Sequence, residues 1–77
     1  MENKLLKNQG EILGGLGKTF PVVYACPQED YVEFWCRLDN HDTGKQLCFP
    51  ILNSDVKERN PYAVVNAIWE YILEYMI

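Results

Sequence analysis

The feature of this sequence that most constrains the fold is the strict alternation of residues 31–38, YVEFWCRL. One set of alternate side chains is apolar: Val32, Phe34, Cys36 and Leu38. The set between them mixes aromatic and charged groups: Tyr31, Glu33, Trp35 and Arg37. Successive side chains of a β-strand point to opposite faces, so the pattern predicts a strand that places its first set on a core.

The segments on either side supply partner strands. Residues 19–26, TFPVVYAC, and 45–52, KQLCFPIL, are rich in the β-branched and aromatic residues that favour strands. The segments between, 27–30 and 39–44, consist largely of turn-forming residues. A proline in each outer segment indicates an edge strand, because proline donates no ladder hydrogen bond. We therefore predict a three-stranded antiparallel meander, whose last strand also points three apolar residues inward: Leu47, Phe49 and Ile51.

A long helix is predicted to run from residue 61 to the C-terminal end of the chain. Asn60 suits the capping position before it, and Pro61 suits the first helical position. Its polar residues form one narrow stripe: Asn66, Glu70 and Glu74. The opposite face is expected to pack on the sheet: Val65, Ile68, Ile72 and Met76. The polar stretch 53–60, NSDVKERN, is expected to connect the sheet and this helix.

The N-terminal region is expected to be an arm that a glycine-rich connection joins to the body. Residues 2–13, ENKLLKNQGEIL, favour a short helix or a partly ordered arm, interrupted by Gly10. Most glycines fall between residues 10 and 17, so a flexible connection is predicted from Gly10 to Lys18. The 77 residues would thus form a single small α+β domain, 1–77. In it, an arm and glycine-rich linker (1–18) precede a βββα body (19–77), in which the meander packs against the long C-terminal helix.

The charge distribution argues against direct binding of nucleic acid. The formal net charge is −4, and residues 29–42 hold five acidic residues against one base, which also gives −4. The acidic residues are Glu29, Asp30, Glu33, Asp39 and Asp42. Such a segment repels a polyanion. No apolar run reaches the roughly 20 residues that span a bilayer, so we expect no membrane partner and a cytoplasmic location.

The stretch GGLGKTF, residues 14–20, raises the question of a phosphate-binding loop. Residues 13–19, LGGLGKT, resemble the variant loop of the ParA-like ATPases, which implies nucleotide binding. The lysine that precedes the glycine pair in that family is Leu13 here. A phosphate loop also needs a buried strand before it and a helix after it, whereas KNQGEI precedes this stretch and the strand-like FPVV follows it. The context therefore predicts a linker, with no bound cofactor.

The remaining reactive residues do not form a recognisable catalytic or metal site. His41 lies in the predicted hairpin loop, away from the strands that carry Cys26, Cys36 and Cys48. Neither a Cys–His pair nor the close ligand spacing of a structural zinc site is present. We expect three reduced cysteines, with at least Cys36 in the core. The sequence predicts a protein that is not an enzyme and binds no metal.

Two surfaces remain as candidate interaction sites. The first is the outer face of the sheet, with Tyr31, Glu33, Trp35 and Arg37 and with Val23 or Tyr24 beside them. An alternative is that the N-terminal arm covers this face and places Leu5 and Leu6 over Trp35. The second is a flank of the long helix, expected to mediate self-association: Tyr62, Trp69 and Leu73. Burial of this flank under a loop or a strand edge is the alternative there.

The leading hypothesis is a small acidic protein-binding module that acts as an inhibitor or adaptor. The profile of a minimal, acidic, single-domain chain is typical of phage-type inhibitors and toxin immunity proteins. Its partner would be a larger protein with a basic surface, such as the nucleic-acid channel of an enzyme. The residues expected to bind are Glu29, Asp30, Tyr31, Glu33, Trp35, Arg37, Asp39 and Asp42. A self-associating structural subunit, a homodimer, is a further possibility.

The predicted element order, α-β-β-β-α, is similar to that of the double-stranded-RNA-binding fold. This resemblance implies a module that binds duplex RNA. That family carries a lysine-rich cluster at the start of its last helix, where phosphates bind. The corresponding residues here are Lys57-Glu58-Arg59-Asn60-Pro61, followed by apolar positions. This departure, together with the acidic net charge, weighs against direct RNA binding.

Overall fold

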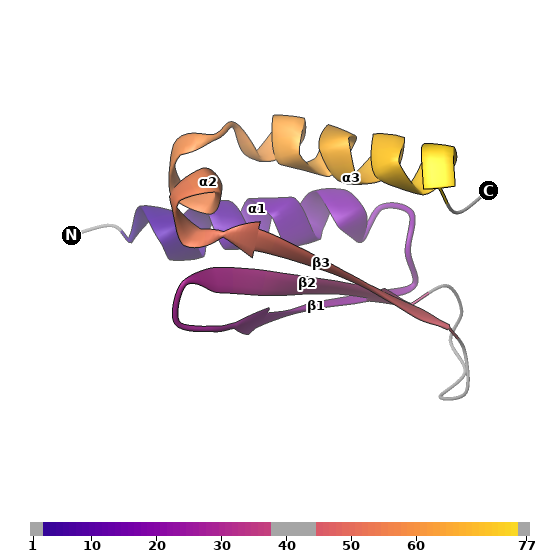
Figure 1. The fold of residues 1–77 in the computed structure, drawn as a ribbon, viewed down its shortest axis with the longest axis horizontal. Helices are drawn as coiled ribbons and strands as arrows, with labels where there is room; N and C mark the ends of the chain where they lie inside the picture. Colours follow the sequence, from indigo (N-terminus) through magenta and orange to yellow (C-terminus); the bar gives the residue numbers. More distant parts are fainter. Residues whose placement is uncertain (1–2, 38–44, 76–77) are drawn as a thin grey trace.

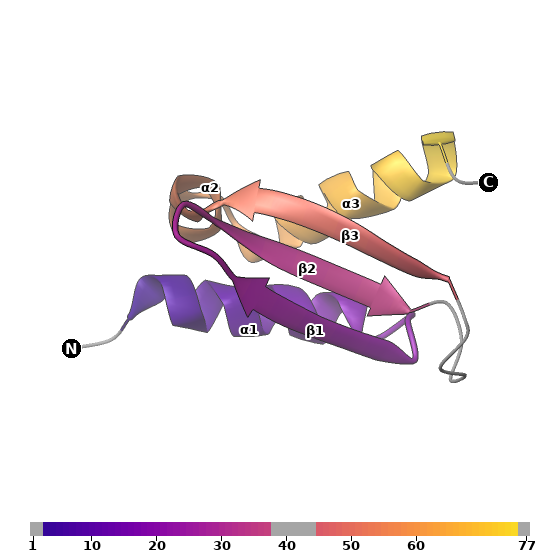
Figure 2. The ribbon, with the colours of Figure 1, turned by 60° about the horizontal axis from the view of Figure 1, so that its bottom comes forward.

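The computed structural model describes residues 3–37 and 45–75 of the chain. Its elements are α1 (Lys4–Leu16), β1 (Val22–Pro27), β2 (Tyr31–Arg37), β3 (Gln46–Leu52), α2 (Asn53–Glu58) and α3 (Pro61–Tyr75). Figures 1 and 2 show two layers, with α1 and α3 on one face of the sheet and the short α2 at one end. This arrangement confirms the predicted α+β fold with a meander and a C-terminal helix.

The sheet has the predicted order, β1-β2-β3, and both strand pairs are antiparallel. Its inner face is built from rows of apolar side chains across the three strands, such as Ala25↔Phe34↔Phe49 and Val23↔Cys36↔Leu47. Most of the predicted inward side chains are buried: Val32, Phe34, Cys36 and Phe49. Leu47 and Ile51 are partly buried and pack against this cluster. The predicted sheet face is thereby confirmed, while Leu38 lies outside the described residues.

Each edge of the sheet carries a proline that faces away from β2. The amide of Gln28 donates to the carbonyl of Tyr31 at 2.7 Å, and the amide of Asn53 donates to that of Asp30 at 3.0 Å. Backbone groups of antiparallel strands alternate between facing the partner and facing outward. Pro27 and Pro50 therefore occupy outward positions. Each removes a donor from a free edge without removing a hydrogen bond from the ladder.

The predicted glycine linker is wrong, because Gly10, Gly14 and Gly15 lie within α1. The helix is stabilised by burial: Ile12 and Leu16 have no exposed surface in the core. Such packing overrides the low helix propensity of glycine. Gly15 also permits a close helix contact, since a Cβ built there would lie 2.9 Å from Cγ2 of Val65 on α3.

The helix α2 was not expected from the polar stretch 53–60. Its single buried residue, Val56, is fully covered by the core. The side-chain amide of Asn8, itself buried on α1, donates to the carbonyls of Val56 at 2.9 Å and Lys57 at 3.2 Å. These two hydrogen bonds attach the last turn of α2 to α1, and they satisfy carbonyl groups that a short helix leaves unpaired.

The start of α3 follows the prediction. The side chain of Asn60 accepts a hydrogen bond from the backbone amide of Tyr62 at 2.8 Å, and Pro61 between them is the first residue of α3. The expected inward residues Val65, Ile68 and Ile72 are buried, together with Val64. Met76 lies outside the described residues. In the part of the chain that the structure describes, no helix has the length and apolar character needed to cross a membrane.

Candidate protein-interaction site

The outer face of the sheet is left open by the helices. Both long helices pack on the inner face (Figure 2), so the alternative in which an N-terminal arm covers Trp35 is wrong. Leu5 packs against the core, and Leu6 points into solvent with 59% of its surface exposed. We call the outward-facing residues of the three strands the open face: Val22, Tyr24, Cys26, Tyr31, Glu33, Trp35, Arg37, Gln46, Cys48, Pro50 and Leu52.

Two stacked aromatic rings form the centre of the open face. Tyr24 on β1 lies directly opposite Trp35 on β2, with ring centroids 6.1 Å apart and planes 3° from parallel. The hydroxyl of Tyr24 donates to the side-chain oxygen of Gln46 on β3 at 2.9 Å. This bond crosses the middle strand and orders the tyrosine. Rigid aromatic side chains bind a partner with a small loss of conformational entropy, which makes them frequent binding hot spots.

A glutamate and a cysteine lie beside this aromatic pair. The carboxylate of Glu33 accepts hydrogen bonds from Nε2 of Gln28 at 3.3 Å and from Sγ of Cys48 at 3.8 Å. Burial, the charge and hydrogen bond of Glu33, and the nearby Cys26 together raise the pKa of Cys48. On the inner face, burial raises the pKa of Cys36 to about 11. Both residues are therefore held as neutral thiols at physiological pH, and all three cysteines are free.

The acidic turn between β1 and β2 is attached to α2. Asn53 donates from its side-chain amide to the carbonyl of Glu29 at 3.0 Å and from its backbone amide to that of Asp30, also at 3.0 Å. The backbone of the turn is thus fixed, while both acidic side chains are exposed. This places two carboxylates at one end of the open face, next to Tyr31.

A hollow lies at the same end of the open face. Its volume is about 410 Å³, and its lining residues are Tyr31, Glu33, Pro50 and Leu52. Leu52 has 57% of its surface exposed. The hollow therefore combines apolar walls with one negative charge.

Six of the eight residues predicted to bind a partner lie along the outer side of β2 or in the turn before it: Glu29, Asp30, Tyr31, Glu33, Trp35 and Arg37. Asp39 and Asp42, together with His41, lie outside the described residues. Of the two neighbours considered on β1, Tyr24 belongs to the open face, whereas Val23 packs against the core. Leu52 and Gln46 were missed. Their alternation with Ile51 and Leu47 on β3 was the signal that places them on the outer face.

The predicted self-association flank is only partly exposed. Tyr62 and Leu73 have 71% and 61% of their surfaces exposed. Trp69 is partly buried and stacks on Phe20 with ring centroids 5.2 Å apart. The tryptophan therefore closes the end of the core near the α1–β1 connection, and the flank offers two exposed residues that are separated by about three helical turns.

Searches for similar proteins found no matching family model, no matching curated protein and no matching solved structure. Among residues 3–37 and 45–75, no group of three or more histidine, cysteine or acidic side chains is placed to hold a metal ion. The features of the molecule that bear on its function are therefore the open face and the acidic turn.

Proposed function

We propose that this chain is a small non-enzymatic protein-binding module, which acts as an inhibitor or adaptor by docking on a basic surface of a larger protein. The observation that carries the proposal is the open face. An ordered Tyr24–Trp35 pair occupies its centre, and the exposed acidic residues Glu29 and Asp30 lie at its end. In this proposal the aromatic pair supplies buried contact area, and the carboxylates steer a cationic partner toward it.

The sheet edges support docking through the face. An extended peptide that joins a sheet edge needs a continuous row of backbone donors and acceptors. Pro27 interrupts the donors of the β1 edge, and Pro50 interrupts those of the β3 edge. Strand addition is thereby disfavoured on both sides. A partner is therefore expected to bind the open face, where the aromatic side chains of Tyr24 and Trp35 lie.

Acidic charge favours a partner that itself binds polyanions. A protein surface that is built to hold nucleic acid is lined with lysine and arginine, and these residues also attract carboxylates. The chain carries a net charge of −4 on only 77 residues. We therefore propose a nucleic-acid-processing enzyme as the class of target, with the acidic turn occupying part of its basic groove.

The test is capture of a partner from a nuclease-treated lysate by the immobilised chain, followed by mass spectrometry. The double variant Glu29→Lys/Asp30→Lys and the variant Trp35→Ala should each weaken binding of the captured protein at least tenfold, a change of about 1.4 kcal/mol. The matched control is Glu11→Lys/Glu58→Lys, which makes the same change of net charge at exposed positions on α1 and α2. Equal losses in both double variants would show that only net charge matters and would refute docking through the open face.

One observation favours a second candidate, binding of duplex RNA. The observed order of the main elements, α1-β1-β2-β3-α3, is similar to that of the double-stranded-RNA-binding fold, and Lys57 and Arg59 are exposed just before α3. A gel shift with duplex RNA at several salt concentrations tests this function. Binding that weakens with salt and is abolished by Lys57→Glu/Arg59→Glu would support it over the protein-binding proposal.

A further inference from the structure

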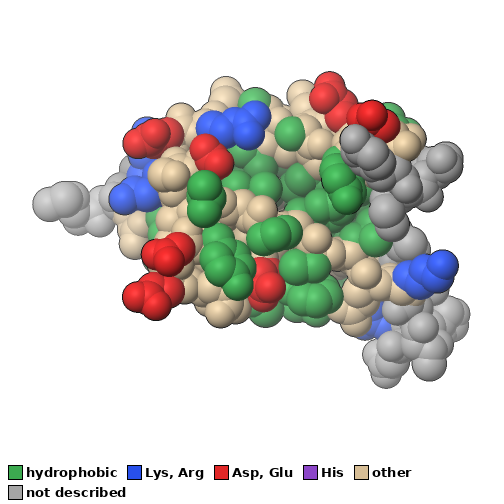
Figure 3. Space-filling model, viewed as in Figure 1, with side chains coloured by type: hydrophobic (Ala, Val, Ile, Leu, Met, Phe, Trp, Pro, Cys, Tyr) green, Lys and Arg blue, Asp and Glu red, His purple; other side chains and the backbone are tan. Residues whose placement is uncertain are grey.

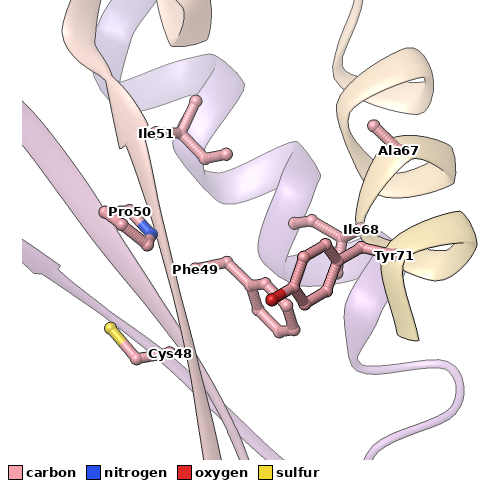
Figure 4. A pocket seen from close by; sticks show the side chains of 7 residues that line it. All are labelled: Cys48, Phe49, Pro50, Ile51, Ala67, Ile68 and Tyr71. Carbon is pink, nitrogen blue, oxygen red and sulfur yellow. The ribbon is translucent and has the colours of Figure 1, made fainter. Parts of the chain in front are cut away.

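A second hollow lies between β3 and α3, on the inner side of the β3 edge. Figures 1 and 2 show the helix and the strand diverging toward the C-terminal end of α3. The resulting groove has a volume of about 330 Å³. Its lining residues are Cys48, Phe49, Pro50, Ile51, Ala67, Ile68 and Tyr71 (Figure 4). Phe49 meets Tyr71 edge to face, with centroids 5.9 Å apart, so an aromatic pair forms one end of the groove.

This groove and the hollow of the open face meet at one residue. Pro50 lines both of them. Figure 3 shows several groups of hydrophobic side chains on this side of the molecule, with backbone and an acidic side chain between them. Tyr71 has half of its surface exposed on one side of the edge, and Leu52 has 57% exposed on the other. Exposed apolar side chains therefore lie on both sides of the β3 edge.

The charges along this surface are acidic. Among the described residues that line the two hollows there is no lysine or arginine, and Glu33 lines the outer one. On α3, the exposed residues Glu70 and Glu74 follow Ala67 and Tyr71 by three positions, so they run along the helical wall of the groove. Pairing of two copies through this surface would bring these carboxylates together. A cationic partner is complementary to them.

The free edge of β3 limits how a partner can bind the groove. Pro50 removes a donor from the centre of the free edge, so an added strand is disfavoured and side chains must make the contact. A volume of about 330 Å³ lies at the lower limit of ordinary ligand pockets, and one or two bulky side chains fill such a space.

We infer that the β3–α3 groove is a docking site for a bulky apolar side chain of a partner protein, presented by a segment that carries lysine or arginine on either side of it. This inference rests on the proposed function, because the segment belongs to the same basic partner that the open face is proposed to contact. It adds a second point of attachment on the other side of the β3 edge, and it specifies the chemistry of the segment that is recognised.

A random-peptide library displayed on phage provides the test, with the full-length chain as bait. Selected peptides should share an apolar residue flanked by basic residues. Ala67→Trp fills the groove from an exposed position of α3 and should weaken binding of a selected peptide at least tenfold. Ala63→Trp makes the same change one turn earlier, outside the groove, and should leave affinity unchanged. Circular dichroism checks that both variants are folded.

A second pair of variants covers the case in which the added tryptophan disturbs the helix. Ala67→Lys places a positive charge in the groove and should repel a cationic peptide, whereas Ala63→Lys should not. Peptides that bind all four variants equally but are lost on Trp35→Ala would overturn the groove and keep the open face. Peptides unaffected by any of these changes would overturn both. Failure to select any peptide, or selection of peptides without basic residues, would also refute the inference.

Discussion

At the scale of single residues, two of the cysteines are kept as thiols for different reasons. Cys36 has no exposed surface, and its environment on the inner face excludes the charged thiolate. Cys48 lies on the open face, where burial is partial. The carboxylate of Glu33 disfavours the thiolate by electrostatic repulsion and accepts a hydrogen bond from the neutral thiol. Only the pKa of Cys48 depends on a neighbouring charged side chain, Glu33, which can be neutralised without disturbing the core.

This difference predicts a change in thiol reactivity. In the variant Glu33→Gln, the pKa of Cys48 should fall, because a negative neighbour is removed, and more thiolate will be present at mildly alkaline pH. Alkylation by iodoacetamide, followed site by site with mass spectrometry, should become faster at Cys48, and its pH midpoint should move lower. Glu29→Gln is the matched control. Cys36 should stay unlabelled in all forms while the chain is folded, and an unchanged rate at Cys48 would contradict the assigned role of Glu33.

At the scale of elements, α1 shows how packing decides the structure of an ambiguous segment. Its second half contains three glycines, yet it lies against α3 with Ile12 and Leu16 in the core. The glycines are not equivalent. A side chain at Gly14 would meet no other atom within 4 Å, whereas one at Gly15 would meet the branched side chain of Val65.

This contrast predicts opposite effects of the same substitution at adjacent positions. Gly14→Ala should raise the free energy of unfolding by about 0.5–1 kcal/mol, because alanine favours the helix and meets no steric obstacle. Gly15→Ala should lower it, since overpacking against a stiff valine costs about 1–3 kcal/mol and exceeds that gain. Urea unfolding at equilibrium measures both. A stabilising Gly15→Ala would show that α1 and α3 separate easily and that their close contact contributes little.

The sequence predicted the elements that have strong local patterns. The alternation of residues 31–38 placed Phe34 inward and Trp35 outward, and Asn60-Pro61 located the start of α3. The glycine-rich half of α1 was misjudged because its helix depends on contacts with α3, which lie about 50 residues away in the chain. The helix α2 has one buried residue, Val56, so its sequence shows no helical repeat of apolar residues that could have predicted it. The open face was identified as a candidate, but only the position of α1 in space shows that helices leave it uncovered.

At the scale of the whole molecule, the free edges of the sheet bear on how the chain associates. The outer strands β1 and β3 each pair with β2 on one side only, which leaves one free edge on each. An exposed edge is a template for pairing with other chains. Pro27 and Pro50 each occupy an outward backbone position, one on either edge. Together with the net charge of −4, they act against edge-to-edge association of copies.

Replacing both prolines should therefore increase self-association. The double variant Pro27→Thr/Pro50→Thr restores an outward amide on each edge, and its weight-average mass in sedimentation equilibrium should rise with concentration more steeply than that of the wild type. Pro21→Thr, at an exposed position before β1, serves as the control and should behave like the wild type. If the double variant matches the wild type as well, charge alone limits association and the prolines have no such role.

The placement of both long helices on one side of the sheet has a consequence for how this protein can change over generations. Side chains of the inner face hold the fold together, and substitutions there are limited by dense packing. Side chains of the open face contribute less to stability, so they can be exchanged at small thermodynamic cost. A chain built in this way can alter the partner that it recognises while it keeps its architecture. Related sequences should therefore diversify fastest at Tyr24, Trp35 and Leu52 and slowest at Phe34 and Ile12.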